Sequence, residues 1–287
     1  MNVDQPTIVR HQVPPSLRGV IVGIVGHDDV APPGGRARIQ PASSLLILEI
    51  SLTSPLHIRP LHAGLDADVA HRTFLAGLST APVQTVFFGR HTSIQIYLSP
   101  MGAYQLLGIP GTETARIVAS ADELVPQWAH DLADRMTDFT NWPQRFAAVD
   151  RELVRHAGIE FAAAPLVTWA WNELQLSGGQ VRVGELAQRS GWSVRHLGQL
   201  FKAVTGVSLK EVARLIRFEH IHAELGAWQL SDVAQRHGLS DQSHLCREVL
   251  QFSGETPLSL STSRRPTAFT ALGVQPGDFG YALRNHR

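Results

Sequence analysis

The C-terminal third of the sequence contains an internal repeat that decides the fold of that region. Residues 186–201 read LAQRSGWSVRHLGQLF, and residues 233–247 read VAQRHGLSDQSHLCR. The first eight residues of the copies align at an offset of 47, whereas the later His-Leu pair aligns at an offset of 48. One residue is therefore inserted in the second copy, and we place it just after the start of that copy's later helix.

The first half of each copy has the residues of a helix that must stop abruptly beneath a second helix. Ala187 and Ala234 are small, so another helix can cross closely above them. Gly191 and Gly238 follow four residues later, and glycine adopts the left-handed backbone that ends a helix at little cost. This spacing is typical of the first helix of a helix-turn-helix.

The second half of each copy predicts the helix that enters DNA. Ser193 and Ser240 stand where a side-chain oxygen can cap the helix start. Leu197 and Leu245 then point back into the core of the unit. In a helix-turn-helix the second helix lies in the major groove. A pair of helical hairpins used only for packing is the alternative, but it leaves the doubled caps and core positions unexplained.

A longer helix is expected between the two copies, over residues 208–225. Ser208 and Glu211 have the spacing of a capping box. Such a helix would hold the two units at a fixed separation. That matters because the two DNA-reading helices must enter successive major-groove segments, about 34 Å apart on one face of the duplex.

These residues resemble the DNA-binding domain of the AraC/XylS family of bacterial regulators over residues 183–257. Besides the two copies, the resemblance rests on TGVS at 205–208 and GETP at 254–257. The sequence departs from the family at Val249-Leu250 and at Leu260-Ser261, where members usually carry an aromatic residue and an aromatic-Arg pair. The resemblance implies a transcription factor, and contact with RNA polymerase if it is an activator.

We expect the DNA-reading helices at about residues 193–203 and 241–251. Arginine can bind guanine, and glutamine adenine, through two hydrogen bonds each. The resemblance also implies base contacts at Arg195 and Gln199. For His196 a packing or phosphate role is favoured, and His244 is a weaker candidate than its neighbours. The candidate DNA-binding residues are Arg195, His196, Gln199, Gln242, Ser243, His244 and Arg247.

Phosphate contacts should position the protein on the duplex without reading its sequence. Amides at helix starts and basic side chains are the usual donors. The candidates are Ser193, Ser240, Lys202, Lys210 and Arg217.

The first part of the chain, up to about Pro100, has the texture of short strands. The runs GVIVGIVG at 19–26 and LLILEISL at 45–52 are rich in Val, Ile and Leu, and Pro/Gly clusters separate such runs. Helices are expected at 102–107, at 122–139 with Asp122 as its cap, and at 141–157 with Asn141 as its cap and Gly158 after its end. The last two either pack on the strands or form a dimer seam. The fold class is therefore α+β: a β-rich barrel with helices, then an all-α domain of two helix-turn-helix units.

We divide the chain into a β-rich sensing or dimerisation domain at 1–160, the DNA-binding domain at 161–261 and a loose tail at 262–287. Residues 95–103 (QIYLSPMGA) and 106–110 (LLGIP) resemble a cupin-like sensing domain that precedes this DNA-binding unit in some family members. A small-molecule effector and a homodimer are the implied partners, besides double-stranded DNA.

Composition suits a globular protein, with 44% hydrophobic and 17% charged residues. The net charge is zero, but residues 1–160 carry −3 and residues 161–287 carry +3, which favours DNA binding by the C-terminal part. The single cysteine, Cys246, allows no disulfide within the chain, and no leader precedes the first domain, so we expect a cytoplasmic protein. The apolar runs are too short for a membrane span.

Two alternatives remain beside an effector-controlled regulator. The first is a DNA-binding protein whose N-terminal domain only dimerises. The second is a cupin-like metal enzyme, for which Glu49 and scattered histidines are the candidate ligands. A metal cupin should show a His-x-His pair followed by a Glu, and the N-terminal part has none; His220 and His222 have the spacing on an expected helix, where they diverge. We therefore expect no catalytic residue, metal or cofactor. The histidines weighed are His57, His62, His71 and His91.

Overall fold

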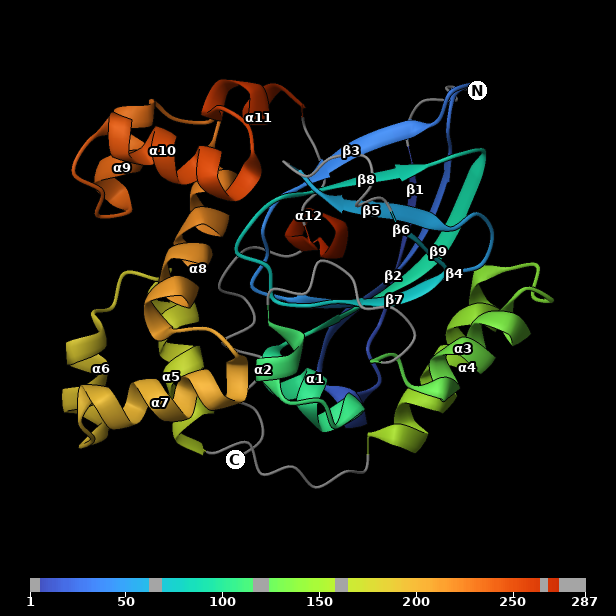
Figure 1. Cartoon of the computed structure of the whole chain (residues 1–287), viewed down its shortest axis with the longest axis horizontal. Helices are drawn as coiled ribbons and strands as arrows, with labels where there is room; N and C mark the ends of the chain where they lie inside the picture. Colours follow the sequence, from blue (N-terminus) through green and yellow to red (C-terminus); the bar gives the residue numbers. More distant parts are fainter. Residues whose placement is uncertain (1–5, 62–68, 116–123, 158–164, 264–267, 274–287) are drawn as a thin grey trace.

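The computed structural model describes residues 6–61, 69–115, 124–157, 165–263 and 268–273. Two antiparallel sheets lie beside a group of helices that contains both repeat copies (Figure 1). The expected boundary at residues 160/161 falls outside the described residues, as do His62, Asp122 and Gly158.

The β-rich part forms two open sheets that face each other. Sheet A has the strand order β1-β2-β9-β4-β7, and sheet B has the order β3-β8-β5-β6. Because the described strands of one sheet do not pair with those of the other, the part is a sandwich and not the closed barrel named in the expected fold class. The strands are β1 (Thr7–His11), β2 (Ile21–Val30), β3 (Arg36–Gln40), β4 (Leu46–Ser51), β5 (Leu56–Pro60), β6 (Val69–His71), β7 (Thr73–Ala76), β8 (Val83–Phe87) and β9 (Arg90–Leu98).

Each face of sheet A has its own partner. Alternate residues of β2, β4 and β9 point away from sheet B, where Ile24, Leu48 and Ile96 are buried beneath helices. A register shift in β2 between Ile21 and Gly23 sets which residues face inward from there on. The other face looks toward sheet B and leaves room for a cavity.

Four helices follow the sheets: α1 (Pro100–Leu107), α2 (Gly111–Thr114), α3 (Gln127–Met136) and α4 (Trp142–His156). The expected cap of α4 is confirmed, since the Asn141 side chain accepts a hydrogen bond from the Gln144 amide. The helix expected from 122 is shorter, because α3 begins only after Pro126. Helices α3 and α4 pack on each other, and α3 lies against β4 and β7.

A short 3-10 helix, η1 (Pro15–Leu17), lies between β1 and β2 in the N-terminal part.

The C-terminal part is a series of helices, as expected. The helices are α5 (Pro165–Leu176), α6 (Val183–Ser190), α7 (Val194–Thr205), α8 (Leu209–Glu224), α9 (Leu230–Arg236), α10 (Gln242–Ser253) and α11 (Pro257–Ser263). The capping box of α8 is present in full between Ser208 and Glu211.

The end of the chain departs from the expected loose tail. Ala268–Leu272 forms helix α12, which returns to the β-rich part and lies between the two sheets (Figure 1). Phe269 and Ala271 are buried against sheet A. This segment is rich in Pro, Gly and Arg, which predicted a loose conformation. Composition cannot show that Phe269 and Ala271 pack on strands that are distant in the sequence.

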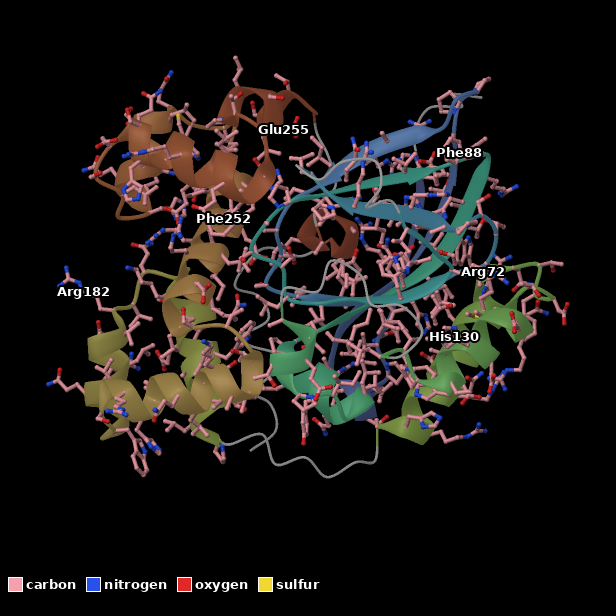
Figure 2. The ribbon with its side chains drawn as sticks, in the orientation of Figure 1. Arg72, Phe88, His130, Arg182, Phe252 and Glu255 are labelled. Carbon is pink, nitrogen blue, oxygen red and sulfur yellow. The ribbon has the colours of Figure 1, made fainter. Side chains whose placement is uncertain are left out.

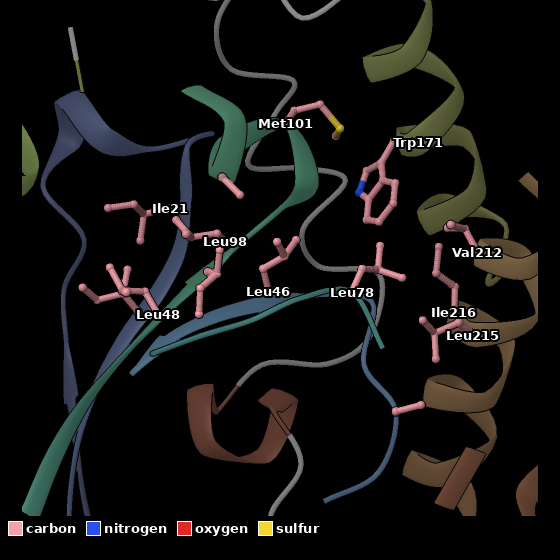
Figure 3. Close-up of a cluster of buried hydrophobic side chains, with 14 of the residues drawn as sticks. Ile21, Leu46, Leu48, Leu78, Leu98, Met101, Trp171, Val212, Leu215 and Ile216 are labelled. Carbon is pink, nitrogen blue, oxygen red and sulfur yellow. The ribbon is translucent and has the colours of Figure 1, made fainter. Parts of the chain in front are cut away.

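One apolar core runs through both parts of the molecule. Leu78 and Met101 of the β-rich part lie beside Trp171 of α5 and Ile216 of α8, all nearly inaccessible to solvent (Figure 3). Burial of this continuous surface favours a fixed arrangement of the two parts over independent tumbling.

Replacing either repeated core leucine with alanine should destabilise the protein by about 2–5 kcal/mol, because Leu197 and Leu245 are fully buried. Urea unfolding followed by circular dichroism measures the loss. Leu250→Ala on the same helix as Leu245 is the matched control, since Leu250 is 50% exposed and should change stability by less than about 1 kcal/mol. Equal losses for Leu245→Ala and Leu250→Ala would contradict the assigned core.

Candidate nucleic-acid interface

The first helix-turn-helix consists of α6 and α7, and its turn has the predicted geometry. Ala187 is buried where the helices cross, and Gly191 has a φ of +75°, the left-handed conformation that ends α6. The Ser193 hydroxyl accepts a hydrogen bond from the His196 amide at 3.2 Å, which caps α7. The alanine, glycine and serine of the first copy therefore take the positions that the repeat predicted.

The second unit, α9 and α10, differs from the prediction at its cap. The cap of α10 is Asp241, whose carboxylate accepts from the His244 amide at 2.7 Å, while the Ser240 hydroxyl donates to Asp241. The inserted residue therefore lies in the turn before α10, since α10 begins at Gln242, which corresponds to Val194 at the offset of 48. A turn accommodates an extra residue without changing which side of the helix is buried.

Helix α7 carries its candidate residues on the surface. Arg195, His196 and Gln199 are all exposed, while Leu197 and Phe201 are fully buried on the opposite side. The imidazole of His196 stacks on the Trp192 indole, with ring centroids 4.3 Å apart. This arrangement favours the expected packing role for His196 and leaves Arg195 and Gln199 free to contact a ligand.

Helix α10 divides its candidates into two groups. Gln242, Ser243 and Arg247 are exposed along one side. His244 is half-buried, and its ring lies between the Ser240 hydroxyl at 3.3 Å and the Glu248 carboxylate at 3.6 Å. Because both ring nitrogens of His244 have partners within the protein, it is the weakest base-reading candidate of the four.

The basic residues expected to contact phosphates differ in their exposure to solvent. Lys202 and Lys210 are exposed, but the Arg217 side chain is only 18% exposed and donates to the buried Glu248 carboxylate at 3.0 Å. Arg217 therefore joins α8 to α10, and the structure does not place it as a surface cation. A sequence cannot reveal this, because Arg217 and Glu248 meet only when the second unit packs on α8.

One surface residue beside α7 escaped the sequence analysis. Trp192 is 52% exposed in the turn before the helix, next to Val194, which is 53% exposed. Two large apolar side chains at the start of a DNA-reading helix can contact thymine methyl groups and sugars. The sequence contains no clear signal for this exposure, since both copies have a large apolar residue at this position and the one in the second unit, Leu239, is buried.

The β-rich part contacts the C-terminal ends of both α7 and α10. The Ala42 amide donates to the Phe252 carbonyl near the end of α10 at 2.8 Å. The Phe252 ring lies against Phe218 of α8, where α8 and α10 meet (Figure 2). At the end of α7, the backbone of Gly111 in α2 lies directly against the backbone of α7. A Cβ on Gly111 would lie 2.0 Å from the Val204 carbonyl oxygen.

A buried acid of α8, Glu219, joins this helix to the loop between β3 and β4 that also carries Ala42. Glu219 accepts hydrogen bonds from the Ser44 amide at 2.6 Å, the Ser44 hydroxyl at 2.7 Å and the Ser43 hydroxyl at 3.4 Å. Complete burial raises the pKa of Glu219 to about 8, because it outweighs the opposite effect of these hydrogen bonds. We call residues 41–45 the β3–β4 loop.

A cavity of about 520 Å³ lies between the sheets and reaches this loop. Most of its wall is apolar, with polar groups that include His27, Arg38, Glu49 and Gln95 from the inner faces of the sheets. It continues past Ser43 to Phe218, Glu219 and His222 of α8. A cavity of this size and lining is suited to a small organic molecule.

The polar groups of the cavity form a network that sequence reasoning identified only in part. The Glu49 carboxylate lies 3.3 Å from the His91 imidazole and accepts from the Gln95 amide at 2.8 Å. Burial lowers the pKa of His91, but the hydrogen bond and charge of Glu49 outweigh it, so the pKa is raised overall. His27 was missed; it is 8% exposed, and its Nδ1 lacks a hydrogen-bond partner.

The network does not form a metal site within the described part of the chain, where no group of three His, Cys, Asp or Glu side chains has suitable geometry. His57 makes an edge-to-face contact with Phe88, and His71 makes a tilted ring contact with Phe74. Cys246 is a half-buried free thiol on α10. None of the described helices is long and apolar enough to cross a membrane.

A family model described as a helix-turn-helix domain matches residues 186–263. Among solved structures, the chain is similar to the C-terminal domain of AraT, a response regulator from Geobacillus stearothermophilus, with 20% identity and a TM-score of 0.34 over 38% of this chain and 94% of AraT's domain. It is also similar to ToxT from Vibrio cholerae, with 10% identity and a TM-score of 0.45 over 90% of this chain and 97% of that one. A ToxT structure with bound unsaturated fatty acid gives 8% identity and a TM-score of 0.44, over 83% and 94%. No curated protein sequence matches the chain.

Glu219→Gln should remove a pH-dependent part of the stability. With the pKa raised from 4.5 to about 8, the contribution of Glu219 is fully present below pH 4.5 and is lost as the pH rises through 8. The wild type should therefore lose more stability between pH 6 and pH 9 than Glu219→Gln, whose neutral amide can still accept from Ser44.

Urea unfolding at the two pH values measures this difference, with the exposed Glu113→Gln as the matched control. If the wild type and Glu219→Gln lose equal stability over this range, Glu219 does not titrate as assigned.

Proposed function

We propose that this chain, whose residues 186–263 form an AraC-type helix-turn-helix domain, controls transcription by binding one DNA sequence with both of its helix-turn-helix units. The observation that carries the proposal is the pair of exposed polar surfaces on α7 and α10, each on the second helix of a capped unit with a buried leucine core.

Base recognition is assigned to the exposed side chains of the two helices. On α7, Arg195 is suited to a guanine and Gln199 to an adenine in the major groove. On α10, Gln242, Ser243 and Arg247 have the same function in the adjacent groove segment. His196 and His244 make a smaller contribution, since their rings are engaged with Trp192 and with Ser240 and Glu248.

Backbone contacts are assigned to the helix starts and to two lysines. The first-turn amides of α7 and α10, near Ser193 and Ser240, are assigned to phosphates, which the positive end of a helix attracts. Lys202 and Lys210 are exposed cations that can add salt-dependent affinity without sequence choice. Arg217 acts indirectly in this proposal, by fixing α10 on α8 through Glu248.

Control by an effector is the second part of the proposal. A small molecule in the cavity would touch the β3–β4 loop, which bonds to α8 through Glu219 and to α10 through Phe252. A molecule that favours one position of this loop would thereby favour one placement of the reading helices, which requires different affinities for the two states. Dimerisation, and contact with RNA polymerase if the protein is an activator, remain predictions.

Selection of duplex DNA from a random library tests the proposal directly. The wild type should enrich one site with two elements about one helical turn apart, because the two units read successive groove segments. Combining Arg195→Ala with Arg247→Ala removes a side chain from each helix, and affinity for the selected site should fall by at least about tenfold, measured by fluorescence anisotropy.

The control is Arg151→Ala, which removes an exposed arginine from α4 in the N-terminal part and should leave affinity unchanged. Failure of the wild type to enrich any sequence, with and without a cell extract as an effector source, would contradict the proposed function. Equal affinity of the wild type and the double variant would contradict the assigned reading residues.

A further inference from the structure

Helix α12 is seated on the inner face of sheet A as a ligand would be. The Phe269 and Ala271 side chains are 4% and 6% exposed. They form an apolar cluster with Val25 and Tyr97, two strand residues that also line the cavity. Helix α12 therefore covers side chains of sheet A that an apolar effector would otherwise contact.

Two features of the sheet fit this helix specifically. The Arg10 guanidinium on β1 donates to the carbonyls of Thr270 and Ala271, both at 3.0 Å, where the unpaired carbonyls of a helix end favour a cation. The absence of a side chain at Gly23 makes room for Leu272, because a Cβ there would lie 2.1 Å from its Cδ2. The hydrogen bonds from Arg10 and the close contact of Leu272 with Gly23 together indicate a specific binding site for α12 on sheet A.

Helix α12 forms part of the cavity wall. Residues 268–271 line the cavity together with Phe218 and His222 of α8 and with Leu260 of α11. Its walls are therefore supplied by the β-rich part, by the DNA-binding part and by the segment that follows it. Anything that enters the cavity and needs the surface under Phe269 must move α12.

We propose that α12 covers, as a built-in ligand would, a part of the inner face of sheet A beside the cavity, and that an apolar or amphipathic small molecule competes with it for that surface. This rests on the proposed effector control and adds its mechanism: binding releases the segment that ties the end of the DNA-binding domain back to the β-rich part. The polar groups around His27 and Gln95 would accept the polar end of the molecule.

A fluorescence titration with the neutral apolar probe N-phenyl-1-naphthylamine tests the competition in the full-length protein. Phe269→Asp puts a charge where α12 is buried and should dislodge it, so the probe should bind at least about tenfold more tightly than to the wild type. Arg10→Ala removes only the exposed anchor, keeps the apolar cluster intact and should tighten binding several-fold. Arg10→Ala decides the outcome if Phe269→Asp does not fold.

Phe88→Asp is the matched control, since Phe88 is 52% exposed at the edge of the sandwich far from the DNA-binding helices (Figure 2). It should bind the probe as the wild type does. Unchanged or weaker binding by both α12 variants would overturn the proposal. So would no probe binding by any of the proteins, and neither result would affect the DNA selection, which tests the proposed function separately.

Hydrogen exchange provides an independent readout in the unaltered protein. The Gly273 amide donates to the Phe269 carbonyl at 2.8 Å, so it is protected while α12 is folded. A saturating concentration of the probe should speed exchange in the peptide that covers 268–273. Bound probe with unchanged or slower exchange there would overturn the competition.

Discussion

Glu219 lies buried at the point where α8 meets the β3–β4 loop, and its carboxyl group has three donors from Ser43 and Ser44. Burying an acid is costly unless its polar atoms are satisfied, so this contact forms only when loop and helix keep one relative position. The neighbouring Ala42 amide holds the end of α10 in the same way. The placement of α8 and α10 therefore depends on a single loop of the β-rich part.

The rest of the arrangement follows from this constraint. Apolar side chains from both parts fill one core beside it, and the close backbone contact of Gly111 with the end of α7 holds the first reading helix. Because the cavity is lined by the same loop and by α8, the proposed effector control would couple the contents of the cavity to the positions of α8 and α10. Coupling of this kind needs no long pathway, since the contacts involved are adjacent.

The sequence predicted those features of the helices that depend on residues close to one another in the chain. The glycine stops, the caps of α4, α7 and α8, and the leucine cores follow from residues within a few positions of one another. Pairings between distant residues could not be found this way. Arg217 looked like a surface cation because nothing nearby shows that Glu248 would be buried against it, and α12 looked loose because its docking site is on β1 and β2.

The shorter strands show the same limit. Strands β3 and β5 alternate charged or polar residues with apolar ones and have little hydrophobic signal, because some of their side chains line a partly polar cavity. Asp241 replaced Ser240 as the cap of α10 because the inserted residue lies in the turn, which two aligned sequences alone do not locate. The sequence predicted the exposed candidate residues of the two repeat copies. It did not predict the cavity between the sheets.

A hydroxyl-radical footprint of the full-length protein on its selected site tests the central claim most directly, that one chain reads two adjacent groove segments. We expect two protected segments on one face of the duplex, centred about one helical turn apart, with the second lost in Arg247→Ala and the first retained. A single protected segment, or two segments on opposite faces of the duplex, would contradict it.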